Sequence, residues 1–151
     1  MIRNTAVVIG GVVLSGLLTA LMGWLIAQSD DMRLLQDVSE ARLAHQSIPA
    51  DKADAAWDAI ARAHRRGTWV YAPLVALTVG VFVGVLAGSW PWQLGVVAAA
   101  PFAFIFSVDV HGVFPGLGIL ASYLTVAGVG AWAGSRLRSW LGAGHGRPTK
   151  S

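Results

Sequence analysis

"WVYAPLVALTVGVFVGVLAG", residues 69–88, contains no charged side chain over a length that could cross a bilayer. The hydrocarbon core is about 30 Å thick, and a helix crosses it with about 20 predominantly apolar residues. Three further uncharged runs lie around this one, at residues 6–27, 92–108 and 113–133. The sequence therefore predicts an all-α polytopic membrane protein, a bundle of four transmembrane helices.

The composition agrees with this fold class. Of the 151 residues, 55% are hydrophobic and 13% are charged, whereas about a quarter of an average soluble domain is charged. Asp109 is the one formal charge between Gly67 and Ser135. The chain has no cysteine, which excludes disulfides, thiolate catalysis and Cys-ligated metals.

The net charge of +3 does not indicate a nucleic-acid-binding surface. The basic residues of the polar segment alternate with acids and form no continuous stripe. Anionic lipid head groups are the favoured counter-charge. We therefore expect the lipid bilayer as a partner, and no nucleic acid.

The polar segment, residues 28–68, follows a first transmembrane helix in residues 1–27. Ser29 and the acids after it form an N-terminal helix cap, and Pro49 begins a second amphipathic pattern. In that pattern Trp57 and Ile60 share a stripe with Ala53 and His64. The segment reads as an extramembrane helical hairpin between spans 1 and 2. Residues 69–140 hold the other three spans, and residues 141–151 form a flexible polar tail.

Tryptophans mark the ends of the predicted spans, where their amphipathic rings prefer the head-group level. Six of the seven lie near such ends, and Trp57 lies in the polar segment. Four spans place both termini on one face. Lys and Arg near the span ends almost balance between the faces, and we predict the plasma (inner) membrane with both termini cytoplasmic.

Small residues recur at four-residue intervals in the second and fourth spans. Such residues let helix backbones approach closely in a membrane. Two interpretations stay open, packing within one bundle and a homo-oligomer interface. The predicted helix-packing positions are Gly80, Gly84, Gly88, Gly118, Ser122, Gly130 and Gly134.

Asp109 and His111 lie where the third span leads into the fourth, in "FSVDVHGVFPG". At the head-group level they would be a solvated or capping Asp and an interfacial His. Deeper in the bilayer they would be a protonatable pair that couples proton or ion movement to transport. A transporter of this kind should lose flux when Asp109 is replaced by Asn.

A second candidate cluster lies in "RAHRR" before the second span. In its functional interpretation, this cluster forms an anion cradle for a lipid head group or an anionic cosubstrate. The four histidines show no metal-ligand spacing, and we expect neither a metal nor a cofactor. The cluster comprises Arg62, His64, Arg65 and Arg66.

The stretch "RAHRRGTWVYAP" resembles a segment of the MAPEG family of glutathione-dependent membrane enzymes, which have four spans and form trimers. The resemblance implies that Arg62 and Arg65 face an anionic thiol cofactor. The chain departs from the family where Arg66 replaces an Asn and Trp69 replaces a Glu. It also has no counterpart of the family's Arg- and Tyr-containing motif near spans 3 and 4.

Three functions follow from these patterns. The favoured one is non-catalytic, an accessory, assembly or self-associating subunit that binds a membrane-protein partner or a second copy through the glycine faces and the hairpin. A small transporter or channel that uses Asp109 and His111 is the alternative, and a membrane enzyme of the MAPEG type is the third. An accessory subunit should co-purify with a stoichiometric partner.

Overall fold

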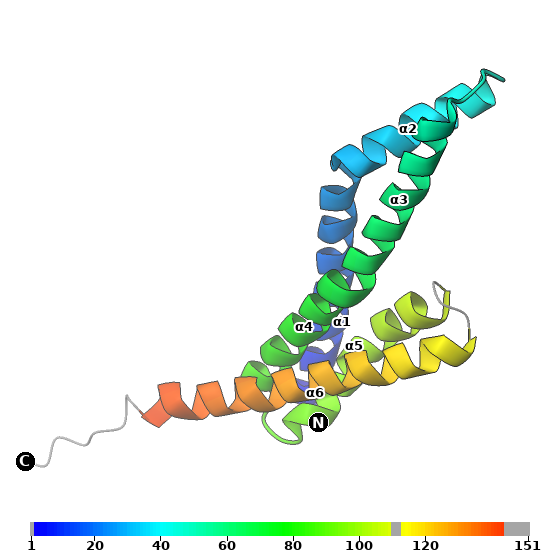
Figure 1. Ribbon diagram of the computed structural model, residues 1–151. Coiled ribbons are helices and arrows are strands. Elements are labelled where there is room, and N and C mark those ends of the chain that lie inside the picture. The colour runs from blue at the N-terminus through cyan, green and yellow to red at the C-terminus, as the bar shows by residue number, and fades with distance from the viewer. Residues whose placement is uncertain (1, 110–112, 144–151) are drawn as a thin grey trace, which may run out of the picture. The chain divides into compact units, whose positions relative to one another are not determined.

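The computed structural model describes the backbone of residues 2–109 and 113–143, and side chains within residues 2–107 and 116–141. Within these ranges the chain is helical and contains no strand, so the predicted all-α class is confirmed there (Figure 1). The elements are α1 (Ile2–Ala27), α2 (Asp30–Leu43), α3 (Ala50–Arg66), η1 (Gly67–Tyr71), α4 (Ala72–Leu86), α5 (Pro91–Phe104), η2 (Ile105–Asp109) and α6 (Val113–Ala143).

Three helical stretches are long and apolar enough to cross a membrane: Ile2–Ala27, Ala50–Leu86 and Gly116–Leu141. The stretch predicted as the third span, Pro91–Ser107, is also an apolar helix but is shorter. It contains Pro101, which removes one backbone donor from the helix. Three such helices support a membrane protein.

The exposed surface is rich in large apolar side chains. Leu17, Leu21 and Val97 are about half exposed or more, and every tryptophan is at least 54% exposed. Tryptophan is highly buried on average in soluble proteins. Such a surface is suited to contact with lipid.

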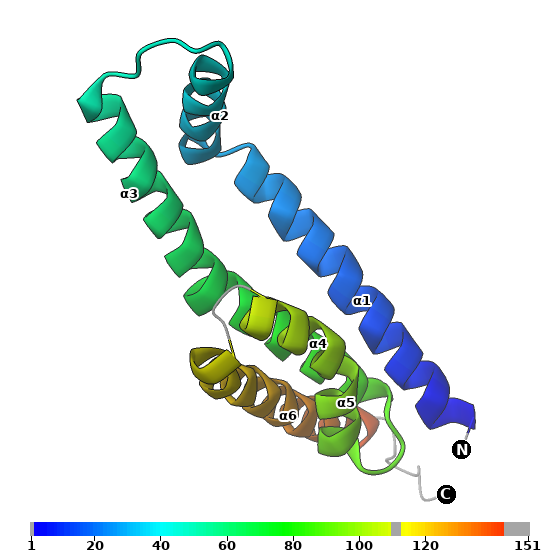
Figure 2. The same cartoon turned by 90° about the vertical axis from the view of Figure 1, so that its right-hand side faces the viewer.

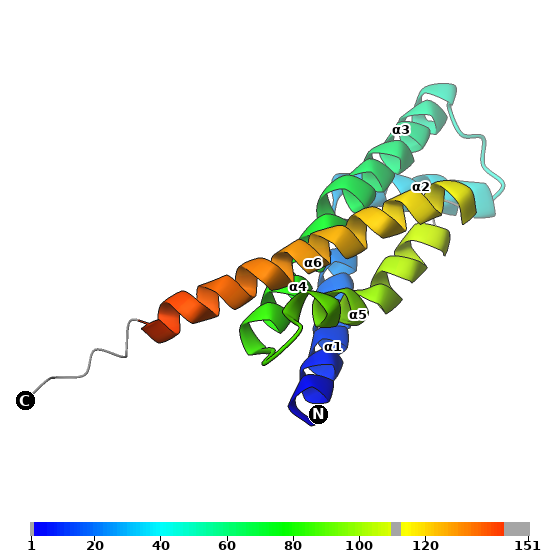
Figure 3. The same ribbon diagram turned by 90° about the horizontal axis from the view of Figure 1, so that it is seen from below.

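The described chain forms two compact units, and the first contains residues 1–17 and 72–151. In this unit α4, α5 and α6 contact one another pairwise (Figures 2 and 3). Most of their buried side chains are small, among them Val79, Val83, Ala98 and Ala127, although Phe102 and Tyr123 are also buried. Small side chains allow the close helix approach that supplies packing contacts in a membrane.

The first half of α1 joins this unit along one helix face. Val7, Gly11 and Ser15, four residues apart, are its buried residues. A Cβ on Gly11 would lie 2.8 Å from Ala98 Cβ and 2.9 Å from Val83 Cγ2. The absence of a side chain at Gly11 therefore lets α1 approach α4 and α5.

Two arginines bind the C-terminal end of α4, where helix carbonyls lack partners within the helix. Arg3 Nη2 donates to the carbonyl of Leu86 at 2.9 Å, and Arg138 Nη1 donates to the carbonyl of Ala87. Their positive charge also complements the partial negative charge of a helix C-terminus. The beginning of α1 and the last third of α6 thus lie at the same end of α4.

The second unit contains residues 18–71, with α2 and α3 packed against each other and joined by the loop drawn in Figure 2. The predicted start of α2 is confirmed, because Met32 N donates to Ser29 Oγ at 3.4 Å. α3 begins directly after Pro49, as predicted. Asp31, near the start of α2, binds Arg62, near the end of α3. The two helices therefore run in opposite directions.

The face that α3 buries differs from its apolar stripe. Ala56 and Ala59 are buried, whereas Trp57 is 70% exposed and Ile60 is 44% exposed. Alanine allows two helices to approach more closely than Trp or Ile does. The small face of α3 is therefore buried, and its larger apolar face remains exposed.

Candidate functional site

The predicted helix-packing glycines of α4 and α6 face each other within the chain. A Cβ on Gly80 would overlap the carbonyl of Ala127, and one on Gly84 would overlap that of Ala131. On α6, a Cβ on Gly130 would lie 2.7 Å from the carbonyl oxygen of Leu77, and one on Gly134 would overlap that of Val81. We call these four glycines and the backbone they touch the α4–α6 seam.

The other three packing candidates lie outside the seam. Gly88 follows the end of α4, and a Cβ there would lie 3.9 Å from the guanidinium of Arg3. Around Gly118 no described atom lies within 4 Å of such a Cβ. The Ser122 hydroxyl donates to the carbonyl of Gly118 in its own helix at 3.0 Å.

Arg62 lies in a charged cluster of the second unit. Its Nη2 donates to Asp31 Oδ1 at 2.7 Å, and its Nε donates to Asp31 Oδ2 at 3.5 Å. Arg66 Nη1 lies 3.9 Å from Asp31 Oδ2. The ion pair between Arg62 and Asp31 joins α3 to α2.

The hydrogen bond from Arg62 lowers the pKa of Asp31, partly against desolvation of the carboxyl, and the charges of Arg62 and Arg66 lower it further. Asp31 is therefore ionised at neutral pH and partly neutralises the predicted anion cradle. The cavity beside Asp31 and Arg66 has a volume of about 40 Å³, whereas small-molecule sites are typically about 300–1,000 Å³. The cavity is too small for a cofactor of glutathione size. His64 and Arg65 lie on the exposed part of α3.

The predicted transport pair lies at the limit of the described structure. The backbone of Asp109 ends η2, and its side chain and the whole of His111 lie outside the described residues. Ser107, in the same π-helical turn, is fully buried, and its hydroxyl has no hydrogen-bond partner among the described residues. π-helical turns occur frequently at functional sites.

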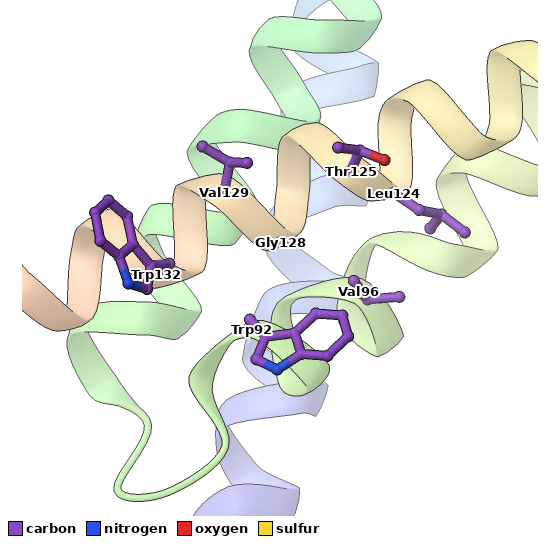
Figure 4. A pocket seen from close by; sticks show the side chains of 7 residues that line it. All are labelled: Trp92, Val96, Leu124, Thr125, Gly128, Val129 and Trp132. Carbon is purple, nitrogen blue, oxygen red and sulfur yellow. The ribbon is translucent and has the colours of Figure 1, made fainter.

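A groove between α5 and α6 was not predicted from the sequence. The groove has a volume of about 460 Å³ and an almost wholly apolar lining. Figure 4 shows that Trp92 and Val96 of α5 and Trp132 of α6 contribute to its walls. Two pairs of lining residues have a four-residue spacing that is visible in the sequence, Trp92 with Val96 and Gly128 with Trp132. Only the packing of α5 on α6 shows that the two pairs face each other. The lining comprises Trp92, Val96, Leu124, Thr125, Gly128, Val129 and Trp132.

Among the residues that the structure describes, no three His, Asp or Glu side chains are grouped closely enough to hold a metal ion. Comparisons with known protein families, with characterised proteins and with solved structures find no match. The resemblance of residues 62–73 to the MAPEG family therefore gains no support from them.

Proposed function

We propose that this chain is an accessory or assembly subunit of a membrane complex and binds its partner through α3. The exposed face of α3, formed by Trp57, Ile60 and the backbone turn between them, carries this proposal. An exposed Trp is favourable as an interface anchor because its large surface becomes buried on binding. The same helix already packs on α2, and its Ala56 and Ala59 are buried.

The α4–α6 seam supports a partner contact at α3 over self-association through glycines. Gly80, Gly84, Gly130 and Gly134 already touch backbone of their own chain. A second copy could reach these positions only if α4 and α6 separated. The glycine faces of the seam therefore serve packing within the chain in this proposal.

The proposal includes four spans, with α2 and α3 as a hairpin outside the bilayer. Pro91–Ser107 is its short span, and at 17 residues it lies at the lower limit for crossing the bilayer. Arg3 and Arg138 bind the same end of α4, which supports both termini on one face. We assign that face to the cytoplasm of the plasma (inner) membrane.

The test is purification of the full chain from its native membrane in a mild detergent, with mass spectrometry of what accompanies it. We expect a stoichiometric membrane-protein partner with the unmodified chain and its loss from Trp57→Ser. Interface anchors of this kind contribute at least about 2 kcal/mol of binding free energy, so retention should fall at least about thirtyfold.

Trp69→Ser is the matched control, because Trp69 is also 70% exposed but lies on η1. It should retain the partner. Recovery of the unmodified chain without a partner, or equal retention by Trp57→Ser and Trp69→Ser, would contradict the proposal.

A further inference from the structure

The α5–α6 groove has the form expected of a binding site for one hydrocarbon chain. It runs along both helices from Trp92 and Trp132 toward Leu124 (Figure 4). Thr125 is the only lining residue with a polar side chain apart from the two indole N–H groups, and its hydroxyl donates to the carbonyl of Ala121 at 2.8 Å. The Thr125 hydroxyl therefore requires no polar occupant.

Gly128 gives the groove its depth. A Cβ at this position would lie 3.4 Å from Val96 Cγ2 and 3.6 Å from the Trp92 ring. A methyl group would thus fit, whereas a larger side chain would occupy the space between α5 and α6. The groove depends on a residue without a side chain at this point.

A cation lies beside the tryptophan end of the groove. The guanidinium carbon of Arg136 is 5.5 Å from the centre of the Trp132 ring, within the range of a cation–π interaction. Arg136 is exposed, and none of the ion pairs among the described residues includes it. Its five donors stay available for an anion.

The charge of this unit is complementary to an anionic occupant. Residues 1–17 and 72–151 contain five basic residues and one acid, Asp109. Asp109 follows the C-terminal end of α5, whereas Trp92 lies in its first turn. The apolar groove therefore belongs to a unit with an excess of positive charge. Two tryptophans line one end of the groove, and tryptophans prefer the level where head groups meet hydrocarbon.

We propose that the α5–α6 groove binds an anionic phospholipid. One acyl chain lies along Val96, Gly128 and Leu124, the glycerol backbone lies between Trp92 and Trp132, and Arg136 binds the phosphate. The cation lies at the tryptophan end of the groove, as a head group lies at the end of its acyl chain.

The test is native mass spectrometry of the full chain in mild detergent, titrated with phosphatidylglycerol or phosphatidylcholine that carry the same two oleoyl chains. A basic residue near a membrane surface contributes about 1 kcal/mol toward an anionic lipid, which corresponds to about fivefold in affinity. We expect phosphatidylglycerol to bind about fivefold more tightly than phosphatidylcholine. Arg136→Gln should remove this preference, and Arg136→Lys should largely retain it.

Two variants fill the groove. Gly128→Leu and Val129→Trp should weaken the binding of both lipids, and Val129 is exposed enough to accept a larger side chain without disturbing the fold. Gly118→Leu is the matched control on the same helix, because no described atom lies within 4 Å of a Cβ added there. It should bind both lipids like the unmodified chain.

Equal binding of the two lipids by the unmodified chain would overturn the proposal, as would unchanged lipid binding in both groove-filling variants. A third outcome would assign the groove to a second copy of the chain. In that case the unmodified chain is a dimer, and Val129→Trp makes it a monomer without changing lipid binding. This would also overturn the proposal.

Discussion

Asp31 interacts with two of the arginines that were predicted to bind an anion. A carboxylate that accepts two hydrogen bonds from one guanidinium forms a strong, geometrically specific pair. Arg62 makes this pair, and Arg66 lies close to the same carboxylate. Their charges therefore hold α2 against α3, and the exposed Trp57 is presented on a fixed helix pair.

The pair predicts a defined pH dependence of stability. Asp31 has a lowered pKa in the folded chain, whereas the pKa of an unfolded Asp is about 3.9. Its contribution is therefore fully present above pH 3.9 and is lost as the pH falls through the lower, folded pKa. Unfolding temperatures followed by circular dichroism should fall less steeply below pH 4 in Asp31→Asn than in the unmodified chain.

Asp30→Asn is the control for this measurement, because Asp30 is exposed and lies 3.9 Å from Arg33. Its acid unfolding should follow that of the unmodified chain. The same acid dependence in Asp31→Asn as in the unmodified chain would show that the Asp31–Arg62 pair contributes no pH-dependent stability.

At the scale of elements, α4 and α6 meet through backbone and not through large side chains. The hydrophobic effect contributes little free energy to helix association among lipid tails. Van der Waals contact and weak Cα–H···O bonds must therefore supply the attraction. Both require close approach. Gly84 and Gly130 provide it from opposite sides of the α4–α6 seam.

Gly84→Ala should therefore destabilise the helical bundle. The added methyl group meets the carbonyl of Ala131, which is backbone and cannot rotate away. Overpacking of this kind costs about 1–3 kcal/mol of unfolding free energy. The measurement is unfolding in mixed detergent micelles with increasing dodecyl sulfate, followed by helicity.

Gly118→Ala serves as the reference for the seam. No described atom lies near its new methyl group, and replacing Gly by Ala in a helix stabilises it by up to about 1 kcal/mol. Gly84→Ala should thus be clearly less stable than Gly118→Ala. Equal stability of the two variants would mean that the seam is looser than described.

At the scale of the whole molecule, the proposed topology separates two polar regions by a bilayer. α6 has 31 residues, about 46 Å at 1.5 Å per residue, and so exceeds a hydrocarbon core of about 30 Å. Its last turns, with Arg136 and Arg138, can extend beyond the core. Arg138 then reaches the end of α4 at that face.

The absence of cysteine makes the topology directly measurable. Ser39 of α2 and Ser139 of α6 are both exposed and can each be replaced by Cys. With cytoplasmic termini, a membrane-impermeant maleimide should label Ser39→Cys in intact cells and Ser139→Cys only after permeabilisation. Ser122→Cys, in the apolar part of α6, should resist labelling in both conditions.

The reverse labelling pattern would invert the proposed orientation. In the four-span topology three spans lie between Ser39 and Ser139, so the two positions lie on opposite faces of the membrane. Labelling of both Ser39→Cys and Ser139→Cys in intact cells would therefore contradict this topology. The result does not depend on knowing the partner.

The sequence by itself determined the helical class, the apolar stretches and the starts of α2 and α3. Hydropathy, the cap at Ser29 and the proline at position 49 act over a few residues, so each can be read locally. The resemblance to the MAPEG family rested on an equally short stretch of sequence, and it did not indicate that Arg62 binds Asp31.

Only the tertiary structure decided which faces meet. Arg62 pairs with a residue 31 positions away, the seam glycines touch backbone of their own chain, and the groove needs α5 beside α6. Small-residue spacing predicts that a helix is approached closely but does not identify the approaching helix. That choice depends on the complementary shapes of distant segments, which exist only once the chain is folded.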